Sequence, residues 1–379
     1  MTVATHALWI GTYPHPAADR PEGVWHVELD AGQGAFTRAR LAVETPSPSF
    51  LAAAAGADAG PGGGTLYAVD EREHGAVSAF AVGLDGTLSP RGAAVPSGGS
   101  SPCYVLARDT QVLVANYGDG VLGVVATEGS GALAGPAHPQ PHSGSGPDVE
   151  RQDGPHAHYV LDDGRGGVLV SDLGTDALWR HAVDAHADSP GGAPPRVAAT
   201  LPPGTGPRHV AALPGGHLVV VGELDPALFV LSPVADGSYD VVARHEATRA
   251  PQGSRRQPSH VEVTADGTRV LVAVRGVDVL AVHAVVPAPD GGAAVLEHLA
   301  DSPVGGAWPR HFAVLTGPGR DVDHDLVVVA NQEDDPARAG DGPTSGLALL
   351  RVARADGTAE LLDVLELPAP ACVVEVPRA

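Results

Sequence analysis

The sequence predicts an all-β fold, a seven-bladed β-propeller whose blades have four strands each. Three observations lead to this prediction: a short phrase that recurs along the chain, an apolar strand that follows each copy, and an offset between the two sets. The ring position of the phrase stands at residues 50, 104, 158, 209, 260, 311 and, in a worn copy with cysteine in place of the ring, 372. Its steps are therefore 54, 54, 51, 51, 51 and 61 residues, and such a period in a β-rich chain is typical of propellers.

The recurring phrase is a proline, one or two further residues, an aromatic or imidazole ring, and an apolar run. The copies in chain order are Pro48-Ser49-Phe50-Leu51, Pro102-Cys103-Tyr104-Val105, Pro155-His156-Ala157-His158, Pro207-Arg208-His209-Val210, Pro258-Ser259-His260-Val261, Pro309-Arg310-His311-Phe312 and the worn Pro370-Ala371-Cys372-Val373. Each copy predicts the first strand of a blade.

The second strand of each blade is an apolar run that stops at a polar residue. These runs are Leu8 to Ile10, Leu66 to Val69, Val112 to Val114, Val168 to Val170, Leu218 to Val221, Val270 to Val274 and Leu326 to Val329; the polar residues that end them are Thr12, Asp70, Asn116, Asp172, Glu223, Arg275 and Asn331. Asp-Gly pairs such as Asp85-Gly86 and Asp266-Gly267 mark hairpin turns, because glycine tolerates a positive φ.

The offset between the two sets predicts how the fold closes. The chain begins with a second strand at Leu8 and ends with a first strand at Cys372. The C-terminal strand should therefore pair with the three N-terminal strands, Leu8 to Ile10, Val24 to Val27 and Phe36 to Val43. Although the length alone would suggest several domains, the repeat predicts a single domain over residues 1–379.

Three segments are expected to be irregular. They are Pro14 to Gly23, which holds His15, Glu128 to Gly154, and the acidic Glu333 to Ser345. The second leads directly into Pro155-His156-Ala157-His158, so we expect a functional loop there and a solvated loop at the third.

Charge and composition limit the partners. The net charge is −22 and every basic residue is arginine, so the surface should repel nucleic acid and anionic membranes. The N-terminus has no secretory or membrane-spanning pattern. The two cysteines, Cys103 and Cys372, are expected to be unpaired, which favours a cytoplasmic protein; the oligomeric state stays open.

Chemistry-bearing residues should gather at one mouth of the propeller. Within a blade, the first strand begins and the second ends at the same edge, because neighbouring strands are antiparallel. The predicted catalytic residues are His156, His158, Arg208, Glu223 and Arg275, and the predicted substrate-binding residues are His209, Arg310, His311, Asn331 and Asn116. His209, His260 and His311 share a repeat position and could equally fill a structural slot. Residues that break the repeat, such as Arg208, Glu223 and Arg275, point more strongly to function.

This set suits the opening of a lactone by water. Histidine can accept a proton near neutral pH, and arginine can bind an anionic group and a developing oxyanion. Glu223 could orient the histidine or act as the base itself. We expect no cofactor; histidine and carboxylate could bind a metal ion, but their spacing is weak evidence and none is predicted.

Several motifs resemble a known family. The run His142-Ser143-Gly144-Ser145-Gly146, with Arg151-Gln152 and Pro155-His156-Ala157-His158, resembles the signature of the seven-bladed propeller lactonases, which include bacterial 6-phosphogluconolactonases; further matches are Asn116-Tyr117-Gly118, Asp172-Leu173-Gly174, Gly206-Pro207-Arg208-His209, Glu223-Leu224, Arg275-Gly276, Pro309-Arg310-His311-Phe312 and Asn331-Gln332. The family is also similar to carboxy-muconate lactonising enzymes. In those relatives a histidine, two arginines and a glutamate are implicated, which correspond here to His156 or His158, Arg208, Arg275 and Glu223.

The resemblance implies a hydrolase that opens an anionic sugar lactone, with 6-phosphogluconolactone as the expected substrate. His156 or His158 would activate water, Arg208 and Arg275 would bind the lactone, and Arg310 would help hold its anionic tail. Two alternatives stay open: a cycloisomerase that closes a muconate-type acid, and a non-catalytic propeller that binds a ligand or protein on its rim.

Overall fold

The structure, a computed structural model, describes residues 5–14, 21–55, 64–83, 85–183, 193–251, 253–288, 292–316, 321–333 and 344–376. The chain divides into two compact units. The first unit is Met1–Pro21, His26–Arg40 and His209–Glu375; the second is Glu22–Trp25, Leu41–Arg208 and Val376–Ala379. Each unit is described separately below, and a single domain over residues 1–379 stays a prediction.

The described strands form seven antiparallel sheets. Their members, in chain order, are β1 (Thr5–Thr12), β2 (Gly23–Asp30) and β3 (Ala35–Glu44) with β29 (Pro370–Glu375); β4 (Leu51–Ala55), β5 (Gly64–Asp70), β6 (Ala76–Val82), β7 (Leu88–Pro90) and β8 (Val95–Pro96); β9 (Pro102–Ala107), β10 (Gln111–Asn116), β11 (Val121–Ala126) and β12 (His138–Pro141); β13 (Ala157–Asp162), β14 (Gly167–Asp172), β15 (Ala177–Ala182) and β16 (Arg196–Thr200); β17 (Pro207–Ala212), β18 (Leu218–Gly222), β19 (Ala227–Pro233) and β20 (Tyr239–Glu246); β21 (Gln257–Val263), β22 (Arg269–Arg275), β23 (Val279–Val286) and β24 (Val295–Pro303); and β25 (Ala307–Val314), β26 (His324–Glu333), β27 (Gly346–Ala353) and β28 (Ala359–Glu366).

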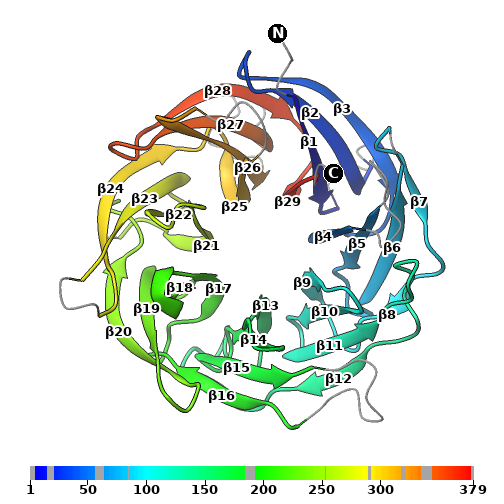
Figure 1. Ribbon diagram of the computed structural model, residues 1–379, viewed down its shortest axis with the longest axis horizontal. Helices are drawn as coiled ribbons and strands as arrows, with labels where there is room; N and C mark the ends of the chain where they lie inside the picture. The colour runs from blue at the N-terminus through cyan, green and yellow to red at the C-terminus, as the bar shows by residue number, and fades with distance from the viewer. Residues whose placement is uncertain are drawn as a thin grey trace. The chain divides into compact units, whose positions relative to one another are not determined.

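Each sheet is a meander of neighbouring strands, as in β21 to β24 and β25 to β28 of the first unit (Figure 1). Six sheets have four strands, and in the remaining one β7 and β8 pair in turn with β6, so the fourth strand is split. The described residues contain no α-helix and one short 3-10 turn, η1 (Pro214–Gly216). These sheets confirm the predicted fold class, a seven-bladed β-propeller.

Closure of the first sheet follows the prediction. β29 pairs antiparallel with β1, with Trp9 opposite Val374 and Ile10 opposite Val373. Both strands belong to the first unit. One sheet is therefore built from the two ends of the chain.

Burial explains why the strand patterns differ within a blade. Every residue of β10 and β22 is buried, as expected for strands covered on both faces. β20 instead alternates between half-buried and exposed residues, which is the pattern of a strand with one face in water. In the first unit, apolar side chains of adjacent sheets form one core, which includes Leu271, Val282, Phe312 and Val329.

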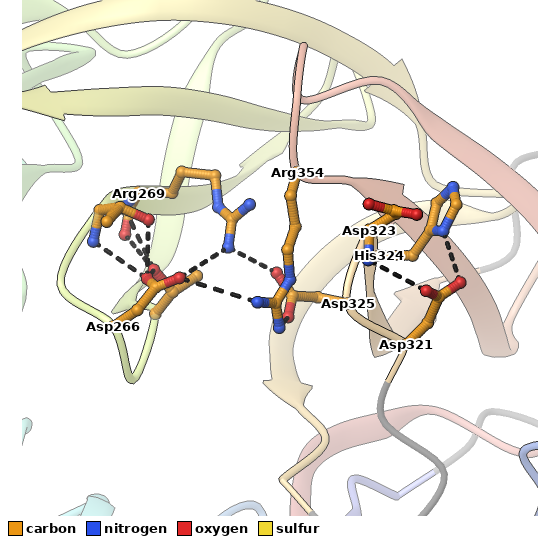
Figure 2. Close-up of polar contacts among 9 residues, drawn as sticks. Asp266, Arg269, Asp321, Asp323, His324, Asp325 and Arg354 are labelled. Atoms are coloured by element: carbon orange, nitrogen blue, oxygen red, sulfur yellow. Dashed lines mark hydrogen bonds and ion pairs between the residues drawn. The ribbon is translucent and has the colours of Figure 1, made fainter.

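A buried ion network joins the last two sheets of the first unit. Asp325, at the start of β26, accepts hydrogen bonds from Arg269 Nη2 at 2.8 Å and from Arg354 Nη2 at 2.5 Å. Arg269 also reaches Asp266 in the preceding turn, at 3.5 Å. Figure 2 shows the two guanidinium groups converging on this carboxylate from different elements.

The predicted irregular segments have different outcomes. Glu128 to Gly154 contains a strand, β12, which pairs with β11, so the prediction of a wholly irregular segment was wrong. Residues 15–20, with His15, and residues 334–343 lie outside the described residues. Among the described residues no helix is long and apolar enough to span a membrane.

Candidate active site

Glu223 and Arg275 form a buried ion pair in the first unit. Glu223 follows directly after β18, and Arg275 is the last residue of β22. Arg275 Nη2 donates to Glu223 Oε2 at 2.7 Å, and the two side chains are only 5% and 6% exposed. Arg275 Nε also donates to the carbonyl oxygen of Gln257 at 3.1 Å. The guanidinium is therefore held in one orientation by a strand end and a carboxylate.

The indole of Trp308 lies against two arginines of the same unit. The Cζ atom of Arg275 is 5.2 Å from the ring centroid, and that of Arg255 is 4.1 Å away. Asp278 Oδ1 accepts hydrogen bonds from the backbone N–H groups of Trp308, at 2.9 Å, and Gly276, at 3.0 Å. Neither Arg255 nor Trp308 is among the predicted site residues.

Three histidines from successive sheets meet in the first unit. The Nδ1 atoms of His209 and His260 are 2.8 Å apart, so one of them donates a proton to the other. His260 stacks on His311 with ring centroids 4.0 Å apart. His311 Nδ1 accepts the backbone N–H of Val373 at 3.3 Å, which leaves the proton of the neutral ring on Nε2. These contacts fit the structural interpretation of the repeated histidine as well as a binding role.

Arg310 lies beside the start of the chain. Its Nη2 donates to the hydroxyl of Tyr13 at 2.5 Å, and its Cζ lies 4.8 Å from the Tyr13 ring centroid. The backbone N–H of Tyr13 in turn donates to the carbonyl of Ala369 at 2.9 Å. Arg310 is thus oriented by residues next to the β1–β29 pair.

His156 belongs to the second unit. Its Nδ1 donates to the carbonyl of Tyr117 at 2.7 Å, and its ring stacks on Tyr117 with centroids 4.6 Å apart. This bond places the proton of the neutral imidazole on Nδ1 and leaves the Nε2 lone pair available. Nε2 lies 3.3 Å from Asp153 Oδ1, and the side chain is 14% exposed.

A series of hydrogen-bonded, buried side chains begins at the backbone of His156. Asp172 Oδ1 accepts a hydrogen bond from the backbone N–H of His156 at 2.8 Å, and its Oδ2 accepts a hydrogen bond from His142 Nδ1 at 2.6 Å. His142 Nε2 is 2.8 Å from His181 Nε2, and His181 Nδ1 contacts Gln140 Oε1 at 2.7 Å. Burial, followed by the nearby His142, lowers the pKa of His181 to about 3. The sequence motif contains His142, but no pattern identified its partner His181.

His158 and Arg208 are more deeply buried than His156. His158 is 4% exposed, and its Nδ1 lies 3.8 Å from Cys103 Sγ. Arg208 is 2% exposed, and its carbonyl accepts a hydrogen bond from Ser171 Oγ at 2.5 Å. Both belong to the second unit.

The two predicted asparagines have structural contacts. Asn116 is completely buried; its Oδ1 accepts a hydrogen bond from Ser97 Oγ at 2.6 Å, and its Nδ2 donates to the carbonyl of Val121 at 3.0 Å. Asn331 Nδ2 donates to the carbonyl of Val304 at 3.2 Å. Their role in substrate binding stays a prediction, and these contacts favour loop support instead.

The described residues contain no group of three or more His, Cys, Asp or Glu side chains arranged to hold a metal ion. In the first unit the structure brings together Glu223 with Arg275, and His209 with His311 through His260. In the second unit it places the rings of both His156 and His158 against Tyr117, the first stacked and the second edge-on. A shared opening for the two groups stays a prediction.

Comparisons with known proteins agree with this architecture. A family model described as "Lactonase, 7-bladed beta-propeller" matches residues 7–373. The chain is 29% identical to the 6-phosphogluconolactonase of Bacillus subtilis over 96% of this chain and 97% of that protein. Among solved structures it resembles a protein from Lactobacillus plantarum (25% identity, 98% and 100% coverage, TM-score 0.81) and a periplasmic gluconolactonase from Pseudomonas aeruginosa (24% identity, 99% and 100% coverage, TM-score 0.81).

Proposed function

The chain belongs to the seven-bladed β-propeller lactonase family, and we propose that it hydrolyses an anionic sugar lactone, with 6-phosphogluconolactone as its substrate. The observation that carries this proposal is the buried ion pair of Glu223 and Arg275, at the two positions that the motif resemblance matches to a glutamate and an arginine of the lactonising relatives. The similarity to the 6-phosphogluconolactonase of Bacillus subtilis over nearly the whole chain supports the choice of substrate.

His156 is the proposed general base. Its Nδ1–H is fixed on the Tyr117 carbonyl, so Nε2 can take a proton from water while the water oxygen attacks the lactone carbonyl carbon. The imidazolium that forms is then close to Asp153, whose carboxylate stabilises the positive charge. When the ring C–O bond breaks, the same proton passes to the leaving oxygen. His158, which is more buried, is the alternative base.

The arginines are proposed to stabilise the negative charge that develops on the lactone during the reaction. Arg275 and Arg208 would donate N–H groups to the carbonyl oxygen as it becomes negative. Glu223 would keep Arg275 oriented without touching the reacting atoms. Arg310, His209 and His311 remain predicted substrate contacts.

The test is lactone opening by four purified proteins: the wild type, Arg275→Gln, His156→Asn and a control. Removing a donor or a base should lower kcat/KM by about 100-fold or more. The control Arg351→Gln removes an arginine paired with Glu360 on the exposed surface and should keep wild-type activity. Acid release is followed at slightly acidic pH, where spontaneous opening is slow, with a muconate-type acid as a second substrate.

Wild-type rates in both site variants would refute this assignment of the site. Turnover of the muconate-type acid without lactone hydrolysis would indicate the cycloisomerase. Thermal melting of each variant separates a loss of chemistry from a loss of folding.

We also propose a cytoplasmic location, without nucleic-acid or membrane partners. Both Cys103 and Cys372 are buried and are not joined in a disulfide, which suits a reducing compartment, and the net charge of −22 disfavours polyanions. Cell fractionation with an antibody would test the location, and recovery in an extracytoplasmic fraction would contradict it.

A further inference from the structure

We propose that Arg255, stacked on Trp308, binds the phosphate group of the substrate and so gives the enzyme its preference for a phosphorylated lactone. This inference rests on the proposed function and deepens it. It assigns a binding residue in the first unit that neither the repeat nor the family motifs indicate.

The indole of Trp308 connects Arg255 to the proposed reaction centre. Arg275, which is paired with Glu223, lies 5.2 Å from the ring centroid, and Arg255 lies 4.1 Å from the same centroid. Arg275 is buried beside the carboxylate of Glu223, whereas Arg255 is exposed. The two Cζ atoms are therefore no more than about 9.3 Å apart, and we propose that a small ligand held at Arg275 extends to Arg255.

The position of Trp308 is built into the fold. Its φ of 61° lies in the left-handed region, which costs a bulky residue about 1 kcal/mol or more. The hydrogen bond from its backbone N–H to Asp278 Oδ1, 2.9 Å, helps to hold this conformation. The residues before the same proline in other repeats, Ser101, Gly206 and Ala369, also have a positive φ, so the backbone conformation belongs to the repeat and the indole is the feature particular to this blade.

The same loop positions Arg255. Gly276 has a φ of 89°, and a Cβ atom added there would lie 2.5 Å from the carbonyl oxygen of Arg255. The loop after β22 thus packs directly against the backbone of Arg255, with no room for a side chain between them. Arg255 is consequently anchored beside the end of β22, although its side chain is exposed.

The charge of Arg255 is not neutralised by a carboxylate among the described residues. Some exposed arginines elsewhere in this unit are paired, for example Arg244 with Asp225 at 2.6 Å and Arg351 with Glu360, whereas Arg249, like Arg255, is paired with no carboxylate among the described residues. In a chain with a net charge of −22, an unpaired cation beside an arginine–glutamate pair is a local exception. Stacking on the indole fixes the guanidinium plane and leaves N–H groups at its edge, which match two oxygens of a phosphate.

The test compares Arg255→Gln with the wild type on 6-phosphogluconolactone and on unphosphorylated gluconolactone. We expect KM for the phosphorylated lactone to rise roughly tenfold to 100-fold, with little change in kcat, because a charge-assisted contact to a non-reacting group is lost. The kinetic constants for the unphosphorylated lactone should not change. The matched control is Arg249→Gln, which removes an exposed arginine from the same unit and should leave both substrates unaffected.

Calorimetry with the products, 6-phosphogluconate and gluconate, separates this inference from the proposed function. If the wild type opens no lactone but binds 6-phosphogluconate at least about tenfold more tightly than Arg255→Gln does, the phosphate site stands and the proposed reaction fails. Equal binding of 6-phosphogluconate and an equal KM in the two proteins would overturn the phosphate site. A wild type that binds neither product would overturn it as well.

Discussion

Buried neutral histidines lower the stability of the folded protein at acidic pH. His283 on β23 is almost completely buried, and its Nε2 contacts the carbonyl of Ala247 at 3.2 Å. Burial is the main cause that lowers its pKa to about 4, and burial likewise lowers the pKa of His181 to about 3. In the unfolded chain both would titrate near 6.5. Between about pH 4 and 6.5 the unfolded state therefore binds more protons than the folded state.

We expect the contribution of these two histidines to the free energy of unfolding to fall as the pH is lowered through this window. For His283 alone the loss at pH 5 relative to pH 7.5 is about 2 kcal/mol, from the two pKa values. Replacing His283 by Phe should remove this part of the pH dependence. Urea denaturation of wild type and variant at both pH values measures it.

The comparison between proteins is needed because other groups titrate too. Burial raises the pKa of Glu262 to about 8, and this group makes the folded state less stable as the pH rises above about 4.5. Its contribution is common to both proteins and cancels in the difference. Identical pH slopes for wild type and His283→Phe would contradict the prediction.

Single residues of the site differ in how far the sequence could predict them. Glu223 and Arg275 could be proposed from the sequence because each breaks the repeat at the end of a second strand; the structure pairs them, and their catalytic role stays a prediction. Arg255 and Trp308 could not. Trp308 depends on a positive φ and on Asp278, which is 30 residues away, and neither leaves a local pattern.

The turn before β22, the start of β26 and the segment after β27 are held together by charge. Arg269 and Asp325 are almost completely buried, and Arg354 is one-quarter exposed (Figure 2). Two cations share the buried carboxylate of Asp325, and the second carboxylate near them, Asp266, is farther away, 3.5 Å from Arg269 and 3.9 Å from Arg354, and 42% exposed. The network is therefore sensitive to the loss of its acid.

Asp325→Ala should lower the free energy of unfolding by about 3 kcal/mol or more, because it leaves buried positive charge without its partner. Glu360→Gln, which removes the acid of the exposed pair with Arg351, should cost less than about 1 kcal/mol. Chemical denaturation of both variants provides the measurement. Similar, small losses in the two would show that the Asp325 network contributes little.

Strands were predictable where burial on both faces imposes a continuous apolar run. All seven predicted second strands are present, in β1, β5, β10, β14, β18, β22 and β26. The outer strands have a weaker apolar sequence pattern, because one of their faces contacts water instead of a neighbouring sheet. The split into β7 and β8 and the short, proline-containing β12 illustrate this, since proline interrupts the ladder of backbone hydrogen bonds.

The first sheet requires both ends of the chain, so its stability should depend on the last few residues. Removing residues 368–379 deletes β29 and leaves the edge of β1 unpaired. We expect a fall in Tm on the order of 10 °C or more, because a whole strand and its buried Val373 are lost. Calorimetry measures it. Removal of residues 377–379 alone is the control.

A synthetic peptide of residues 368–379 should restore part of the lost stability when it is added to the truncated protein. A truncated protein that melts like the full chain would show that β29 is dispensable.

The pairing of β1 with β29 also has a consequence for biosynthesis. During translation β1 emerges from the ribosome hundreds of residues before β29, the strand that completes the sheet. Throughout that interval the nascent polypeptide displays an open row of amide and carbonyl groups, to which another unfinished copy could add a strand. Aggregation during translation should therefore depend on how quickly the codons of β29 are read, even though they encode none of the residues proposed to act on the substrate.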